Sequence, residues 1–343
     1  MTEAKEQTAR LSRIANWKEV IDTANLSPDK DMDVVSKWLI ITRAAVFTMT
    51  ATSALIGGLL AAAVAENPDW LNFGLAFFGL IIAHAANNMN NDYFDMEGGV
   101  DTDDYARVQY APHPVLGGLV SKKRLGTAVF LANVLNLVIL IVLIARAGWP
   151  TLVFALAGLF ISFFYVAPPL KLKHHGFGEP GVFLVWGPLM IGGTYFVTAG
   201  TLPTLGVWLA TIPYAIAVTT VLMGKHIDKL DADKQKGIHT LPVILGEKAS
   251  LRINMGLMVG FYLVVLALVL TGTLGVWLLL VALALPRLRM VLQLYREPRP
   301  SEPPEGYTVW PLWYVSWAFY HNKRAGLLFV AGLALNLLIP LSF

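Results

Sequence analysis

Long apolar runs are the feature that most constrains how this chain folds. Nine of them follow the first 37 residues, and each is close to the length that an α-helix needs to cross a bilayer. Only 14% of the residues are charged, whereas a soluble domain carries about a quarter. The sequence therefore predicts an all-α, multi-pass integral membrane protein. The nine spans are expected at 38–65, 70–89, 125–146, 149–167, 181–199, 205–225, 253–271, 273–295 and 324–342.

The first 37 residues differ from the rest of the chain because they are polar and contain no apolar run. A secretory signal peptide would need such a run near the N-terminus. We expect residues 1–37 to form a polar, amphipathic segment on the surface, and residues 38–343 to form a single transmembrane domain.

The positions of Lys and Arg predict how the spans are oriented. With nine spans and the N-terminus inside, the inside segments and their adjoining helix ends hold all of the 26 basic residues except Arg146. Cytoplasmic loops are enriched in basic residues. We therefore expect the N-terminus and the loops after the even-numbered spans to be cytoplasmic, and the C-terminus to lie on the opposite side.

Composition excludes several classes of function. Cysteine is absent, so disulfides, thiolate nucleophiles and metal sites with cysteine ligands are ruled out. The net charge of +3 is too small to indicate nucleic-acid binding. No feature indicates a protein partner, and the expected surroundings are a lipid bilayer.

Two clusters of acidic residues each follow an apolar span. "NDYFDMEGGVDTDD" at 91–104 follows the second span, and "DKLDAD" at 228–233 follows the sixth. Asp92 and Asp95 are three residues apart, so they share one face of a helix. One such cluster fits the solvated end of a membrane helix as well as it fits a binding site. Two clusters expected on the same cytoplasmic face favour a binding site.

The residues in and around these clusters point to a particular ligand. Carboxylate oxygens suit Mg²⁺, which commonly uses one or two carboxylates together with phosphate oxygens of a substrate. Basic side chains can hold the phosphate oxygens that the metal does not. A purely cation-conducting site would not need those bases, so the combination predicts a diphosphate site. The candidate bases are Arg107, Lys171, Lys173, Lys225, Lys229 and Lys234.

The motifs resemble those of the UbiA superfamily of intramembrane prenyltransferases. "NDYFD" at 91–95 and an Asp-rich turn leading into "KGIHTLPVILG" at 236–246 are similar to its two signature motifs. The stretches at 42–61 and 165–200 are similar to menaquinone-branch members of the superfamily. The resemblance implies nine transmembrane helices around a central cavity, with the two Asp motifs facing each other at the cytoplasmic end.

The resemblance also implies an activity. It is the Mg²⁺-dependent transfer of a polyprenyl group from prenyl diphosphate to a small aromatic acceptor, with 1,4-dihydroxy-2-naphthoate as the first guess. The alternative is an intramembrane terpene cyclase of the same superfamily, which needs no acceptor. A transporter is disfavoured because alternating access needs a site near the midplane, whereas these acids lie at one face.

The resemblance assigns roles to individual residues, and each assignment is an expectation. The expected metal ligands are Asp92, Asp95, Asp101, Asp228, Asp231 and Asp233. The residues expected to act directly in catalysis are Asn91, Asp92, Asp95 and Asp228. The residues expected to bind diphosphate or acceptor are Arg43, Arg107, Tyr165, Lys171 and Lys225. His84, inside the second span, is expected to be a packed, hydrogen-bonded histidine rather than a base.

The second motif departs from the family pattern by one residue. Asp233 lies four residues before Gly237, as the family's second acid does, but the position of the first acid is Lys229. Asp228 is the nearest carboxylate, and five residues of ideal helix rotate it about 140° away from Asp233. We expect an irregular helix between 226 and 233 that turns Asp228 and Asp233 to the site and Lys229 away. The alternative is a regular helix that pairs Asp228 with Asp231.

Overall fold

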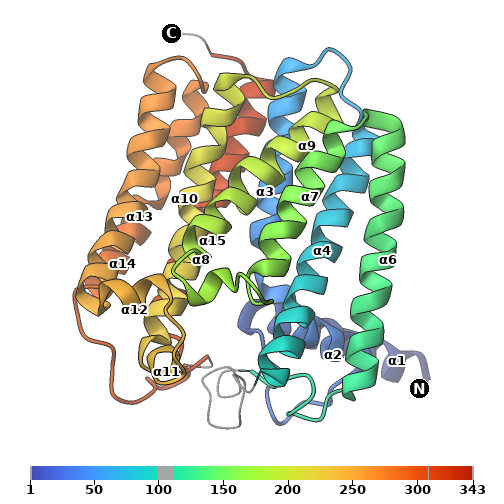
Figure 1. The fold of residues 1–343 in the computed structure, drawn as a ribbon, viewed down its shortest axis with the longest axis vertical. Coiled ribbons are helices and arrows are strands. Elements are labelled where there is room, and N and C mark those ends of the chain that lie inside the picture. Colours follow the sequence, from blue (N-terminus) through green and yellow to red (C-terminus); the bar gives the residue numbers. More distant parts are fainter. Residues whose placement is uncertain (1, 99–110, 308, 342–343) are drawn as a thin grey trace.

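The computed structural model describes residues 2–98, 111–307 and 309–341, with side chains described from residue 12 onward. Regular structure in these ranges is helical, apart from one isolated bridge between His175 and His239. Figure 1 shows long, roughly parallel helices forming one bundle, with α1 (Thr2–Thr23) and α2 (Val34–Ile41) at one end and the C-terminus at the other. The predicted all-α fold is confirmed.

Seven helical stretches of the described chain are long and apolar enough to cross a membrane. They correspond to seven of the nine expected spans, and they indicate an integral membrane protein. The stretches are Ala44–Val64, Trp70–Glu97, Lys122–Ala147, Gly178–Ala199, Leu205–Asp228, Glu247–Leu270 and Val276–Leu294. The first stretch ends with the helix α3 (Phe47–Val64). Three others are the helices α4 (Trp70–Glu97), α10 (Leu205–Asp228) and α13 (Glu247–Leu270).

The other two expected spans are helical but do not meet the same criteria. The run at 149–167 forms α7 (Pro150–Phe164), which has 15 residues and is short for a span. The run at 324–342 belongs to α15 (Tyr314–Leu338), which begins earlier and includes the basic residues Lys323 and Arg324. Nine membrane-crossing helices therefore stay a prediction.

The sidedness of the bundle also stays a prediction, but its two ends differ in character. Arg146 was the one basic residue expected outside. It lies in the last turn of α6 (Lys122–Ala147) and pairs at 2.8 Å with Asp69, the residue that caps the start of α4. The short helices α11 (Leu230–Gln235) and α12 (Leu241–Leu245) lie at the end that also holds α1 and α2 (Figure 1).

The first span begins later than predicted because the helix breaks at Arg43. Its backbone is left-handed, with φ 56° and ψ 47°. This conformation costs a residue other than glycine roughly 1–2 kcal/mol. The break separates α2 from the span, and α2 contacts α1 instead of continuing into the bundle. The indole Nε1 of Trp17 donates to the Asp33 carboxylate at 3.0 Å and ties these two helices together.

The span expected at 181–199 consists of three consecutive helical pieces. α8 (Gly178–Leu184) is followed by a π-helical turn, η3 (Val185–Leu189), and then by α9 (Met190–Ala199). Pro188 has no backbone N–H, so a regular α-helical ladder cannot run through this turn. π-turns inside helices are frequent at functional sites.

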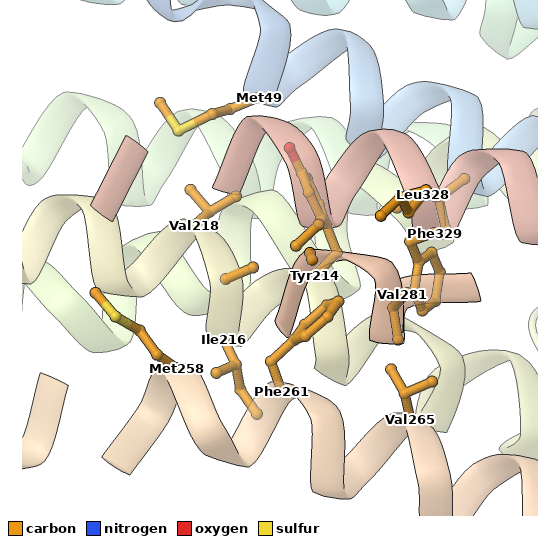
Figure 2. Close-up of a cluster of buried hydrophobic side chains, with 14 of the residues drawn as sticks. Met49, Tyr214, Ile216, Val218, Met258, Phe261, Val265, Val281, Leu328 and Phe329 are labelled. Carbon is orange, nitrogen blue, oxygen red and sulfur yellow. The ribbon is translucent and has the colours of Figure 1, made fainter. Parts of the chain in front are cut away.

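The largest apolar core lies among α10, α13, α15 and the 3₁₀-helical segment η4 (Val276–Ala284). Figure 2 shows Phe261 in this core, with the hydroxyl of Tyr214 pointing away from it, and the ring centroids of Phe261 and Phe329 are 6.3 Å apart. Helices in a bilayer associate through close packing, which small residues permit. At Gly57 in α3, an added Cβ would lie 2.5 Å from the Ile191 carbonyl oxygen. A larger residue there would force α3 and α9 apart.

Candidate active site

A cavity of about 430 Å³ is lined by residues of α3, α4, α7, α8, η3, α10 and α15. This volume lies within the usual range for small-molecule sites. Most of its wall is apolar, and Met49, Val182 and Val218 are among the lining residues. Its polar lining includes Arg43, Asn87, Asn91, Tyr165 and Lys225.

Three ion pairs involve the acidic motifs, two of them with basic residues from other parts of the chain and one within the second motif. Asp92, the most deeply buried of the acids with no exposed surface, pairs with Arg43 at the break before α3. The remaining pairs are Lys173–Asp95 at 3.2 Å and Lys229–Asp233 at 3.8 Å. Removing charges from water costs several kcal/mol for each ion, by order of magnitude, and ion pairing only partly offsets this cost. Such an array is therefore better explained by ligand binding than by stability.

Lys225 adds a further basic side chain at the cavity. It lies in the last turn of α10 and lines the cavity wall. Its ammonium group is close enough to interact electrostatically with Arg43, Lys173, Lys229 and Asp95. Like charges held near one another in a low-dielectric setting repel, so this group of bases favours an anionic ligand.

The residues present fit a Mg²⁺ ion whose coordination is completed by a substrate. The Asn91 side-chain oxygen is buried and accepts no hydrogen bond from the residues that the structure describes, and Asp92 and Asp95 follow it on α4. Asp233 supplies a buried carboxylate from α11. Within the described ranges, no three His, Cys, Asp or Glu side chains converge into a cluster able to hold a metal by themselves. Mg²⁺ commonly uses one or two carboxylates plus phosphate oxygens of a substrate.

A buried hydrogen-bonded chain holds Tyr165 at the cavity wall. The Tyr165 hydroxyl is 3.3 Å from Nε2 of His226, and Nδ1 of His226 is 2.7 Å from a carboxylate oxygen of Glu179. The sequence placed Tyr165 at the site but gave no role to Glu179 and did not single out His226. Their spacing along the chain gives no signal, because the three residues come from different elements.

A model of the UbiA prenyltransferase family matches residues 50–322. The chain belongs to the UbiA prenyltransferase family. It is therefore a prenyltransferase enzyme. This agrees with the cavity, whose polar residues include Asn91 of the family's first Asp motif.

The chain is also similar to named relatives and to a solved structure. The chain is 26% identical over 247 residues to the 1,4-dihydroxy-2-naphthoate octaprenyltransferase of Bacillus subtilis, covering 72% of this chain and 78% of that one. It is 30% identical over 198 residues to the digeranylgeranylglyceryl phosphate synthase of Pyrococcus horikoshii, covering 57% and 65%. A structure of a UbiA homolog from Archaeoglobus fulgidus bound to DMAPP and Mg²⁺ aligns with a TM-score of 0.58 at 15% identity, covering 88% of this chain and 99% of that one.

In this UbiA-family enzyme, Lys173 and not Lys171 reaches the acids. Lys171 is exposed and has a left-handed backbone with φ 39°, whereas the Lys173 side chain is buried against Asp95. The backbone N–H of Lys173 donates to the Tyr165 carbonyl at 3.0 Å and folds the loop back over the end of α7. Burial, together with the neighbouring ammonium groups of Lys173 and Lys171, lowers the pKa of His174 to about 4, so this histidine adds no charge at neutral pH.

The second Asp motif is irregular, as predicted, but its residues are arranged differently. α10 ends at Asp228, Lys229 has φ −103° and ψ 8°, and α11 starts at Leu230. The predicted break between 226 and 233 is thus confirmed. The expectation that Lys229 points away is wrong, because its ammonium faces Asp233 at 3.8 Å. Asp231 is exposed on α11.

Asp228, expected to be a metal ligand, holds the start of α15 instead. Its two carboxylate oxygens accept hydrogen bonds from the backbone N–H groups of Tyr314 and Val315, each at 2.9 Å. A carboxylate is favourable at a helix N-terminus, where N–H groups lack partners. Gly224 permits this contact, since an added Cβ would lie 2.9 Å from the Val315 Cα. Asp228 is therefore not carried into the proposed metal site. Two other expected site residues, Asp101 and Arg107, lie outside the described residues.

Replacing Asp228 with Ala is expected to destabilise the protein by about 1–3 kcal/mol, because two buried N–H groups lose their acceptor. The measurement is the thermal unfolding midpoint in detergent. The control is Asp231→Ala, which removes an exposed acid three residues away and is expected to leave the midpoint unchanged. If the midpoint of Asp228→Ala were unchanged and turnover required a higher Mg²⁺ concentration, Asp228 would be a metal ligand.

Proposed function

We propose that this UbiA-family enzyme transfers a polyprenyl group from prenyl diphosphate to a small aromatic acceptor in a Mg²⁺-dependent reaction. The observation that carries the proposal is the set of paired acids and bases at the polar part of an otherwise apolar cavity. The first guess for the acceptor is 1,4-dihydroxy-2-naphthoate. It is supported by the similarity to the Bacillus subtilis enzyme of that specificity.

The bases of the site would bind the diphosphate. Arg43, Lys173 and Lys225 come from three different elements, so they can contact phosphate oxygens from several sides. Asn91, Asp92, Asp95 and Asp233 would hold Mg²⁺. When bound, the metal stabilises the negative charge on the departing diphosphate. The bond between C1 of the prenyl chain and the diphosphate oxygen breaks, and its electron pair leaves with the diphosphate.

The apolar part of the cavity would protect the reaction. Its lining includes Met49, Val182, Val185 and Val218, which offer no nucleophile to the allylic cation. Exclusion of water prevents side reactions of such an intermediate. A ring carbon of the acceptor then forms the bond to C1 and releases its proton.

The test incubates purified protein with Mg²⁺ and prenyl diphosphates of several lengths, each with an aromatic acceptor or with a prenylated glyceryl phosphate. Mass spectrometry reads the products. A product that combines the prenyl group with an aromatic acceptor supports the proposal. If only the glyceryl phosphate were prenylated, the acceptor would be a glyceryl phosphate and not an aromatic compound. The absence of any product from the aromatic acceptors would overturn the proposal.

A terpene cyclase is the second candidate, favoured by the basic residue Lys229 at the position of the family's first acid in the second motif. The same experiment without any acceptor distinguishes it. Release of a cyclic hydrocarbon from prenyl diphosphate would identify a cyclase.

Lys173→Ala is expected to raise the KM for prenyl diphosphate about 10- to 100-fold, because a buried, charge-assisted contact to phosphate is lost. The KM for the acceptor is expected to change little. Lys171→Ala is the matched control, since it removes the same charge from an exposed position two residues away. Steady-state kinetics in each substrate measure both effects. A larger effect of Lys171→Ala than of Lys173→Ala would contradict this placement.

A further inference from the structure

Three side chains from three helical elements form a hydrogen-bonded chain that ends at the cavity. The indole Nε1 of Trp186, in η3, donates to the hydroxyl oxygen of Thr50 in α3 at 3.2 Å. That hydroxyl lies 2.8 Å from Nδ1 of His84 in α4. Thr50 is completely buried, and both His84 and Trp186 line the cavity.

The hydrogen bonds at Thr50 allow a defined position for the imidazole proton. An indole N–H can only donate, so the Thr50 oxygen is the acceptor of the first bond. That oxygen can at the same time donate its own hydrogen to Nδ1 of His84, and in this arrangement the proton of a neutral ring lies on Nε2. A charged ring would also carry a proton on Nε2. In either state Nε2 is a donor, and within the described ranges no protein group accepts from it.

The π-helical turn makes this arrangement possible. The carbonyl oxygen of Trp186 accepts a hydrogen bond from the Ser53 hydroxyl at 2.6 Å, which fixes the turn against α3. The Trp186 ring meets the His84 ring edge-on, with centroids 5.2 Å apart at 79°. The His84 ring is therefore held by the hydrogen bond between Nδ1 and Thr50 and by the edge-on contact with the indole of Trp186. Its Nε2 is left available to a ligand in the cavity.

His84 packs against the rings of Phe47 and Trp186 and is within electrostatic reach of Arg43. It precedes Asn91 by seven residues on α4, a separation of about 10 Å along a helix. A prenyl chain has no oxygen to accept from Nε2, and leaving a buried donor unpaired is unfavourable. A ring that bears a hydroxyl, carbonyl or carboxylate oxygen can accept from it.

We propose that Nε2 of His84 donates a hydrogen bond to an oxygen substituent of the aromatic acceptor, and that Thr50 and Trp186 position the imidazole for this contact. The inference rests on the proposed transferase function and deepens it by naming the substituent that the co-substrate must carry. A site built to hydrogen-bond a substrate oxygen strongly rejects an analogue that lacks it.

The test compares His84→Phe, which keeps a ring and removes the donor, with His84→Gln, whose amide N–H can replace Nε2. We expect His84→Phe to raise both the acceptor KM and the acceptor Kd about 10- to 100-fold, the Kd being measured calorimetrically without prenyl diphosphate. The KM for prenyl diphosphate is expected to stay within about twofold, since the phosphate-binding residues are unchanged. His84→Gln is expected to recover most of the loss.

Thr50→Val supplies a second variant that leaves the imidazole in place, in case His84→Phe does not fold. It removes the bond that orients the ring, so the acceptor KM is expected to rise about 3- to 10-fold. Thr50→Ser, which restores the hydroxyl, is expected to return the acceptor KM to the wild-type value. If Thr50 had a purely structural role, Thr50→Val would lower the unfolding midpoint and would not raise the acceptor KM selectively over the KM for prenyl diphosphate.

The outcomes separate the inference from the proposed function. If the wild-type enzyme prenylates an aromatic acceptor and His84→Phe binds that acceptor normally, the inference is wrong and the proposed function stands. If the wild type binds oxygenated aromatics in a His84-dependent way but forms no prenylated product, the inference stands and the proposed function is wrong. If the wild type binds no oxygenated aromatic, both are overturned.

Discussion

Replacing Asp92 or Asp95 with Asn is expected to lower kcat by about a thousandfold or more. Each residue lies on the last turns of α4, and each is paired with a base from another element. Asn has nearly the same shape as Asp but no charge, so it weakens both metal binding and the stabilisation of the departing diphosphate. A loss of about 4 kcal/mol in transition-state stabilisation corresponds to a factor of about a thousand. The measurement is kcat at saturating substrate concentrations.

Asp95→Asn is the cleaner of the two variants. The Asp95 side chain keeps 16% of its surface exposed, whereas Asp92 is fully buried against Arg43. Asp92→Asn therefore also weakens a largely buried ion pair with Arg43, which costs stability. The unfolding midpoint of each variant separates this loss from the loss of turnover.

The matched control is Glu97→Gln, which makes the same change of charge on the same helix. Glu97 is exposed and pairs with Lys122 at the surface. Exposed pairs contribute about 0–1 kcal/mol, so Glu97→Gln is expected to behave like the wild type. If Asp92→Asn and Asp95→Asn both turned over at near-normal rates, this cluster would have no part in the chemistry.

The features that could be predicted from the sequence are those that depend on local properties. Seven spans followed from apolar runs, because the length of a membrane helix is set by the bilayer. The break after α10 followed from the register of two carboxylates along one helix. The placement of Asn91 at the cavity followed from a motif whose residues lie on consecutive turns.

The features that could not be predicted depend on contacts between distant parts of the chain. Asp228 was assigned to the metal because the sequence does not show that α15 begins against it. Lys171 was chosen over Lys173 because the turn that exposes one and buries the other is set by the backbone bond to Tyr165. His84 was correctly expected to be hydrogen-bonded, but its partner Thr50 is 34 residues away.

Removal of divalent metal ions is expected to abolish turnover, with activity returning when Mg²⁺ or Mn²⁺ is added. In the part of the site that the structure describes, Arg43, Lys173 and Lys229 are each paired with a carboxylate, so these pairs carry little net charge. Prenyl diphosphate carries more than one negative charge at neutral pH. The side chains alone therefore cannot neutralise the departing diphosphate.

The measurement is the rate in excess chelator, before and after the addition of each metal. The bases contact Asp92, Asp95 and Asp233, so a phosphate that binds these bases competes with the carboxylates. A hard dication held by the carboxylates would supply positive charge to them and to the phosphate. This exchange of partners explains why acids and bases occur in pairs at one site. Full activity in excess chelator would contradict it, because the paired acids would then have no function in the transfer.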